Sequence, residues 1–294
     1  MAEIGLIDVD SHNFPNLCLM KISAYHKAKG DQVEWWNGLK RYDRVYQSKV
    51  FDETYSKDND FVVMADEVIK GGTGYGLDNR LPDEVEHIYP DYSLYGVINT
   101  AYGFLTRGCP RDCPFCIVSD KEGKTSYQVA ELTEFYRGGC HKEIKLLDPN
   151  IVACKDSEKL MEELAGSKAW VDFTQGIDIR CMTDKHCDQL NRMKIKMIHF
   201  AWDNYEFKTY EKLKRFRPLL NMRSRKLRVY VLANYNTTHE QNIERVEKLR
   251  ELGYDPYVMI YDKPNAPKIT RHLQRWCNNK FIFRSCEFKD YKRG

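Results

Sequence analysis

No hydrophobic run in this 294-residue chain is long enough to cross a bilayer, and its first residues lack the pattern of a secretory signal. The ten cysteines also lack the regular spacing of a disulfide framework. These absences exclude an integral membrane protein and a small disulfide-stabilised secreted domain. We expect a cytoplasmic protein with reduced thiols and no membrane partner.

The two parts of the chain carry opposite net charges, although the net charge of the whole is only +3. Residues 1–95 carry a net charge of −7, and residues 96–294 carry +10. A chain of this length fits one large domain or two moderate ones. The asymmetry predicts two domains, 1–95 and 96–294, with a possible anionic partner for the second.

Three of the cysteines, Cys109, Cys113 and Cys116, form a CxxxCxxC run. Thiolates are the usual ligands of iron-sulfur clusters, and a tight loop can offer three sulfurs to one 4Fe-4S cluster while leaving the fourth iron open. Pro110 and Pro114 lack backbone donors and resist a helix or a central strand. The run therefore predicts a metal-binding loop.

Strand-like and helical segments alternate six times from residue 97 onward. The predicted strand–helix pairs are 97–106 with 126–136, 143–147 with 157–164, 170–179 with 184–193, 197–202 with 205–219, 227–233 with 238–252, and 257–261 with 269–278. Thr183 is the expected N-cap of the third helix. This alternation favours a parallel α/β sheet with right-handed crossovers, and six units suit an open, partial barrel.

The cysteine spacing, with the aromatic Phe115 before the third cysteine, resembles the signature of the radical S-adenosylmethionine (SAM) superfamily. The resemblance covers residues 97–294 and implies a six-unit partial (β/α) barrel whose 4Fe-4S cluster, held by the three cysteines, cleaves SAM reductively. The resulting 5′-deoxyadenosyl radical would abstract hydrogen from an unidentified substrate. The electron would come from an external donor such as flavodoxin or ferredoxin.

In barrels of this kind the chemistry lies at the carboxyl ends of the strands. The resemblance implies that Asp148 or Asn150 binds the SAM amino group, that Phe115 lies by the adenine, and that polar residues after strands four and five meet the ribose. The cofactor-binding candidates are Phe115, Asp148, Asn150, Gln175, Arg180, Asp203 and Asn234, with Asp178 and Asn204 at the same edge. Each could instead be a cap or turn residue, and no catalytic residue is assigned.

The sequence predicts a small open α/β, Rossmann-like domain over residues 1–95. Its expected strands are 4–9, 32–36, 44–50 and 61–69, and its expected helix ends near Ala28. It resembles the cobalamin-binding-like domain found ahead of many radical SAM barrels, in which a Gly-Gly turn approaches the nucleotide tail. Residues 71–76 supply such a turn, and residues 10–15 echo an axial-histidine pattern through His12. The turn could equally serve backbone geometry alone, so cobalamin stays an alternative.

Two other function classes remain open. An iron-sulfur electron-transfer protein would need the cluster without the polar residues around it. A zinc-stabilised binding module would need a fourth ligand, for which Cys140 and His141 are the nearest candidates. Cys181, Cys187, Cys277 and Cys286 are spaced too widely for a second cluster and are expected to be buried apolar residues.

A basic stretch in the second domain could bind phosphates of an RNA or nucleotide substrate. It could equally be a solvated helix face with its exit loop. The residues are Lys208, Lys212, Lys214, Arg215, Arg217, Arg223, Arg225, Lys226 and Arg228.

Overall fold

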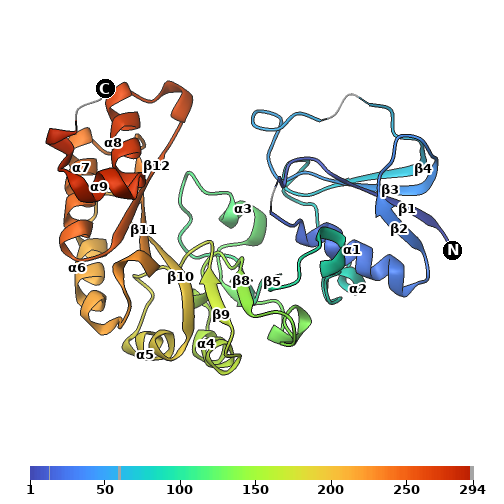
Figure 1. Cartoon of the computed structure of the whole chain (residues 1–294), viewed down its shortest axis with the longest axis horizontal. Helices are drawn as coiled ribbons and strands as arrows, with labels where there is room; N and C mark the ends of the chain where they lie inside the picture. The colour runs from blue at the N-terminus through green and yellow to red at the C-terminus, as the bar shows by residue number, and fades with distance from the viewer. Residues whose placement is uncertain (13, 59–60, 292–294) are drawn as a thin grey trace. The chain divides into compact units, whose positions relative to one another are not determined.

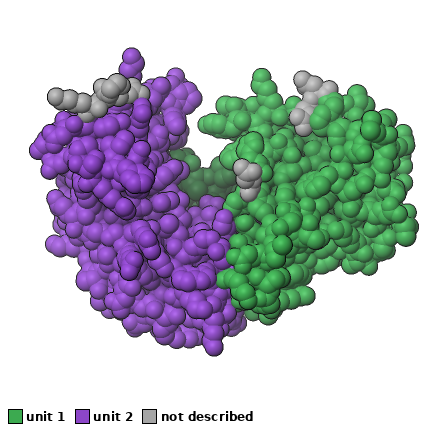
Figure 2. All heavy atoms as spheres, viewed as in Figure 1, with its two compact units in different colours: residues 1–103, 111–124, 130–142 green, residues 104–110, 125–129, 143–294 purple. Residues whose placement is uncertain are grey.

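The computed structural model describes residues 1–12, 14–58 and 61–291 of the chain. These form two compact units, each coloured separately in Figure 2. Unit 1 consists of residues 1–103, 111–124 and 130–142, and unit 2 consists of residues 104–110, 125–129 and 143–294. Within the described part, no helix combines the length and the apolar character needed to span a membrane. The domain boundary at residue 95 stays a prediction.

Unit 1 is built on a four-stranded parallel sheet. Its strands are β1 (Glu3–Asp8), β2 (Gln32–Trp35), β3 (Tyr42–Ser48) and β4 (Ala65–Gly71), in the order β2-β1-β3-β4. Each overlaps a predicted strand. The chain leaves β1 toward β2 on one side and returns to β3 on the other, so the strand order reverses between β1 and β3.

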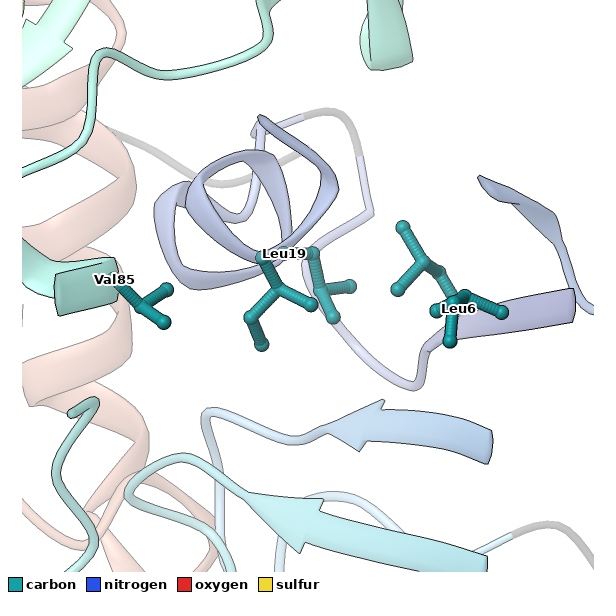
Figure 3. Packing of buried hydrophobic residues seen from close by; sticks show 5 residues of the cluster. Leu6, Leu19 and Val85 are labelled. Carbon is teal, nitrogen blue, oxygen red and sulfur yellow. The ribbon is translucent and has the colours of Figure 1, made fainter. Parts of the chain in front are cut away.

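Helix α1 (Leu17–Ala28) packs on this sheet. The Asn16 side chain caps its first turn by accepting a hydrogen bond from the Leu19 N–H. Leu19 of α1 lies in one buried cluster with Leu6 of β1 and Val85 of the short helix α2 (Asp83–Glu86), as Figure 3 shows. Alternate residues of β1 thus face the helix, and their burial holds the helix to the sheet.

The second sheet has six strands, and its elements are labelled in Figure 1. They are β5 (Thr100–Gly103), β8 (Glu143–Leu146), β9 (Trp170–Phe173), β10 (Lys194–Ala201), β11 (Leu227–Ala233) and β12 (Asp255–Ile260), in the order β12-β11-β10-β9-β8-β5. From β8 to β12 every neighbouring pair is parallel. The parallel α/β sheet is therefore confirmed, while its closure into a partial barrel stays a prediction.

Five helices follow these strands in turn: α4 (Ser157–Gly166), α5 (Asp184–Arg192), α6 (Phe207–Phe216), α7 (His239–Glu251) and α8 (Lys268–Asn278). The Thr183 side chain accepts from the His186 N–H and caps α5, as predicted. A short helix α9 (Lys280–Ser285) follows α8. Figure 1 shows α6, α7 and α8 along one side of β11 and β12.

One face of this sheet forms the core of unit 2. Val171, Ile198 and Val229 of β9, β10 and β11 have no exposed surface, and α7 and α8 pack against β11 and β12. Side chains alternate along a strand, so the residues between them point to the opposite face. There Tyr230 is only half-buried and Met259 is 45% exposed. The sheet thus has an apolar face toward the helices and a mixed polar and aromatic face away from them.

The predicted helix 126–136 is wrong. The chain instead forms strand β7 (Tyr127–Gln128), antiparallel to β6 (Thr106–Arg107), and then a 3-10 turn at Leu132–Glu134. The Val129 N–H donates to the Leu105 carbonyl at 2.8 Å and extends this pairing. A strand partner supplied by the segment before the cysteines therefore outweighs the local helical pattern.

Strand β9 is also shorter than predicted, because the chain leaves the sheet after Phe173. Gly176 has a φ of +114°, which glycine adopts readily, and the next N–H, that of Ile177, donates to the His199 carbonyl at 2.7 Å. The predicted strand residues 174–179 thus form the loop that leads to α5.

Candidate cofactor site

The three-cysteine loop begins directly after β6. Gly108 at its start and Asp112 within it have φ values of +79° and +47°, and the Cys116 N–H donates to the Cys113 carbonyl at 2.9 Å. Cys109 and Cys113 are half-buried and Cys116 is exposed. Over residues 1–12, 14–58 and 61–291, no three His, Cys, Asp or Glu side chains are grouped as metal ligands. The ligand set therefore stays a prediction from spacing and loop geometry.

Asn150 links the end of β8 to the first cysteine. Its side chain is 1% exposed, and its amide Nδ2 lies 3.5 Å from the Cys109 sulfur, to which it donates. Its amide oxygen Oδ1 is buried and has no hydrogen-bond partner among the described residues. The Ser126 hydroxyl donates to the Asn150 backbone carbonyl at 3.0 Å and fixes the turn. A buried acceptor without a donor is unusual in a native protein and is suited to a ligand that carries N–H groups.

Asp148 holds the segment that leads into the loop. One carboxylate oxygen accepts from the Thr106 N–H at 2.5 Å and the Thr106 hydroxyl at 2.7 Å, and the other accepts from the Leu105 N–H at 3.1 Å. Burial raises the pKa of this carboxyl to about 6, and the three hydrogen bonds oppose that rise. The side chain fastens the end of β8 to the start of the loop, a role that the sequence did not reveal.

Asp178 and Arg180 pair with each other in the loop after β9. The Asp178 carboxylate accepts from the Arg180 backbone N–H at 3.0 Å and from its Nε at 2.8 Å. Gln175 in the same loop is exposed, and Phe115 in the cysteine loop is half-buried. The cofactor-binding roles of Gln175, Arg180 and Phe115 stay predictions.

Asp203, directly after β10, is held in place by an arginine that sequence reasoning missed. Arg245 of α7 has no exposed surface and donates to the backbone carbonyls of Trp202, Asp203 and Leu232 and to the Asn242 side chain. Burial raises the pKa of the Asp203 carboxyl to about 6, although the Arg245 and Arg180 charges lower it. The sequence signal for Arg245 is a charge on the helix face that also carries Val246 and Leu249.

Asn234 occupies the turn after β11. It has a φ of +65°, a conformation that asparagine tolerates better than most residues, and its Nδ2 donates to the Tyr261 carbonyl at 2.9 Å. These contacts match the alternative of a turn residue. Its ribose-binding role stays a prediction, as does that of Asn204, whose side chain accepts from the Asn236 amide at 3.3 Å.

Several members of the basic stretch are engaged within the fold. The Arg217 guanidinium donates to the Gly253 carbonyl at 3.0 Å, the Lys226 ammonium donates to another backbone carbonyl, and Arg228 pairs with Asp255 at 3.3 Å. Lys226 and Arg228 lie at the amino end of β11, away from the carboxyl ends where Asn150 and Asp203 lie. Phosphate binding by this stretch stays a prediction.

The remaining cysteines of unit 2 do not form a regular motif. Cys187 and Cys277 are buried, and burial raises the pKa of their thiols to about 11 and about 12. These two are neutral at physiological pH and buried, as expected. Cys181 and Cys286 are only partly buried, so the expectation of burial is wrong for them.

No protein-family model matches the chain, and no curated protein matches it. Its structure is similar to that of the radical S-adenosylmethionine methyltransferase TsrM from Kitasatospora setae with cobalamin and a [4Fe-4S] cluster bound. The TM-score is 0.61 at 12% identity, over 88% of this chain and 75% of that one. The chain therefore shares its fold with this radical SAM methyltransferase. The TsrM structure with tryptophan substrate and the SAM analogue aza-SAM has a TM-score of 0.57 at 12% identity, over 87% of this chain and 72% of that one.

In this radical SAM fold, the glycine-rich turn of unit 1 packs against its own chain. A Cβ added at Gly72 would lie 2.3 Å from the Lys49 carbonyl oxygen, and one at Gly74 would lie 2.3 Å from the Phe51 carbonyl oxygen. These glycines let the turn approach the segment after β3, which accounts for them without a ligand. The cobalamin expectation therefore gains no support from these two positions.

The cobalamin expectation also rests on the loop after β1. His12 is exposed with a φ of +49°, while Asn13 of the same motif lies outside the described residues. The Asp10 carboxylate accepts from the N–H groups of Val50 and Phe51 at 2.8 Å each. The loop lies where the strand order reverses, which is where open parallel sheets commonly bind ligands. His12 is thus placed where a ligand could meet it.

Proposed function

We propose that this chain is a radical SAM enzyme in which Cys109, Cys113 and Cys116 hold a 4Fe-4S cluster. The observation that carries the proposal is the position of Asn150. Its amide Nδ2 donates to the Cys109 sulfur, while its buried amide oxygen has no partner in the part of the chain that the structure describes. The donor set fits the group, because three cysteine side chains lie on one loop and one of them receives a hydrogen bond that stabilises a thiolate.

Each residue around the loop has a distinct role in the proposal. Asn150 Oδ1 accepts from the ammonium group of bound SAM, and Asp148 fixes the loop entrance through Leu105 and Thr106. Asp203 supplies a carboxyl at the carboxyl end of β10 for the ribose. When bound and reduced, the cluster supplies the electron that splits SAM into methionine and a 5′-deoxyadenosyl radical, which abstracts hydrogen from the substrate.

The test is anaerobic reconstitution with iron and sulfide, reduction with dithionite, and chromatographic detection of 5′-deoxyadenosine from added SAM. We expect the product from the unmodified chain and none from Cys113→Ala. Cys140→Ala is the matched control, since Cys140 is an exposed free thiol outside the motif. Product from Cys113→Ala at the level of the unmodified chain would contradict the proposal.

The same preparation separates the two alternative classes. An iron-sulfur electron carrier would show the visible absorption of a cluster but would not bind SAM. A zinc-stabilised module would retain metal without that absorption. Equilibrium dialysis with SAM and an absorption spectrum therefore assign the chain to one class.

Methyl transfer is a second candidate for the reaction on the substrate. It is favoured by the structural likeness to TsrM, which spans 88% of this chain and includes cobalamin in the TsrM structure. Corrinoid absorption bands that persist after gel filtration with hydroxocobalamin, and that shift in a His12→Ala variant, would support it. Failure to retain hydroxocobalamin would leave hydrogen abstraction as the proposed reaction.

A further inference from the structure

Strands β9 and β10 carry polar side chains on the face turned away from the apolar core. Asp172 lies within β9, and Thr174 follows its last residue, Phe173, on the same side as Asp172. The register that pairs Phe173 with Ile198 places His199 of β10 beside Thr174. Three side chains with hydrogen-bond acceptors are thus brought together at the carboxyl end of this pair of strands.

These acceptors lack donors. The Asp172 Oδ1 and the Thr174 hydroxyl are buried and have no hydrogen-bond partner among the described residues. His199 is 7% exposed, and its Nδ1 lies 3.0 Å from the Phe173 carbonyl oxygen. Because a carbonyl only accepts, Nδ1 carries the hydrogen, and Nε2 of the neutral ring is an acceptor. Buried polar groups in native proteins normally find partners, so this grouping indicates a missing donor.

Burial favours the neutral form of the His199 imidazole. Burial lowers the pKa of His199, and the Arg228 charge lowers it further, while the Phe173 carbonyl, Asp172 and Asp255 oppose this. Burial raises the pKa of Asp172, and the Glu143 charge adds to that rise. His199, Lys145 and Lys196 oppose it. A neutral imidazole with an available Nε2 therefore lies near a carboxyl group whose charge an incoming cation would stabilise.

An aromatic surface continues from these acceptors across the next two strands. The His199 ring stacks on Tyr230 of β11 with centroids 5.1 Å apart and an interplanar angle of 9°. The Tyr230 ring meets Tyr257 of β12 edge-on at 5.8 Å. Met259 of β12 lies farther along and is 45% exposed. Planar, polarizable side chains of this kind favour a flat aromatic ligand.

We propose that this face recognises a planar aromatic amine, whose ring N–H donates to His199 Nε2 and whose ammonium group binds Asp172 and Thr174. This proposal names the substrate class of the proposed function. It rests on that function, because only there is the bound molecule a substrate. The binding itself requires neither the cluster nor SAM, because every contact is made by β9 to β12 of unit 2.

The test uses two probes that differ only in the ring donor, tryptamine and 1-methyltryptamine. Their affinities are measured by isothermal titration calorimetry with the full chain, before and after iron-sulfur reconstitution. We expect tryptamine to bind about tenfold more tightly than 1-methyltryptamine, the effect of one well-formed hydrogen bond. His199→Phe keeps an aromatic ring against Tyr230 but lacks Nε2, so the two probes should bind it equally.

A second variant keeps the proposal testable if His199→Phe does not fold. Asp172→Asn should weaken tryptamine binding about tenfold while keeping the preference over 1-methyltryptamine. The matched control is His87→Phe, which removes an imidazole that pairs with Glu134 in unit 1. No binding of tryptamine to the unmodified chain, or a preference that survives in His199→Phe, would overturn the proposal. Either result would leave the 5′-deoxyadenosine test unaffected, so the two proposals fail separately.

Discussion

Replacing Asn150 by leucine is expected to lower the midpoint potential of the reconstituted cluster. The wild-type amide donates to the Cys109 sulfur over 3.5 Å from a position that is 1% exposed. Hydrogen bonds to cluster sulfurs favour the reduced and more negative state, so their loss makes reduction harder. Leucine has a similar size and cannot donate, and it therefore removes the hydrogen bond with little change in packing.

The size of this shift follows from the energy of one hydrogen bond. A net contribution of about 0.5–1.5 kcal/mol corresponds to about 20–60 mV for a one-electron couple. Asn150→Asp should lower the potential more than leucine does, because it adds a negative charge beside the sulfur. The midpoint potential should therefore decrease in the order wild type, Asn150→Leu, Asn150→Asp.

The two substitutions also separate the two ends of the Asn150 side chain. Aspartate keeps an acceptor oxygen for the SAM ammonium group, whereas leucine does not, so only the leucine variant should lose SAM affinity. The potential is measured by redox titration monitored by electron paramagnetic resonance, with Asn191→Leu in α5 as the control. Equal potentials in wild type and both Asn150 variants, at equal cluster content, would refute the reasoning.

Three further outcomes are expected in denaturant unfolding experiments. Gly72→Ala should lose at least about 2 kcal/mol of stability, because its Cβ would lie 2.3 Å from the Lys49 carbonyl oxygen, whereas Gly71→Ala, with nothing within 4 Å, should change little. Arg245→Met should cost about 3–5 kcal/mol, since it removes the Arg245 hydrogen bonds to three backbone carbonyls, two of them in buried contacts. Burial raises the pKa of Asp148 to about 6 from 3.8, so its stabilising contribution is complete below pH 3.8 and is lost as the pH rises through about 6. The wild type should therefore lose about 3 kcal/mol relative to Asp148→Asn over that interval, and a pH-independent difference would contradict this.

Much of the fold was predictable because its signals are local. β11 begins and ends at the predicted residues, and Thr183 caps the helix that it was predicted to cap. The predicted helix 126–136 is wrong because the chain there pairs with β6, a strand that lies well before this segment in the sequence. Local residue propensities carry no information about a pairing partner outside the segment.

The candidate site residues also differ in how far local sequence signals predict them. Spacing located the cysteine loop, and the strand-end rule found Asn150 and Asp203. The rule could not distinguish a residue that faces a ligand from one that fastens the backbone, as Asp148 does. His199 was missed because a single polar residue between apolar ones is also the ordinary pattern of a strand with one buried face.

The contacts of Asp148 and Asn150 bear on how the loop could work without the Gly-Gly-Glu type segment that radical SAM enzymes commonly have after the second strand. The chain has Leu147, Asp148, Pro149 and Asn150 there. Asp148 uses its carboxylate on the backbone at the loop entrance, and Asn150 directs its amide at Cys109. An amide, unlike a carboxylate, can donate to a sulfur and accept from an ammonium group at once. In the proposed function, the Asn150 side chain would therefore serve both the cluster and SAM, while the Asp148 carboxylate holds the loop in place.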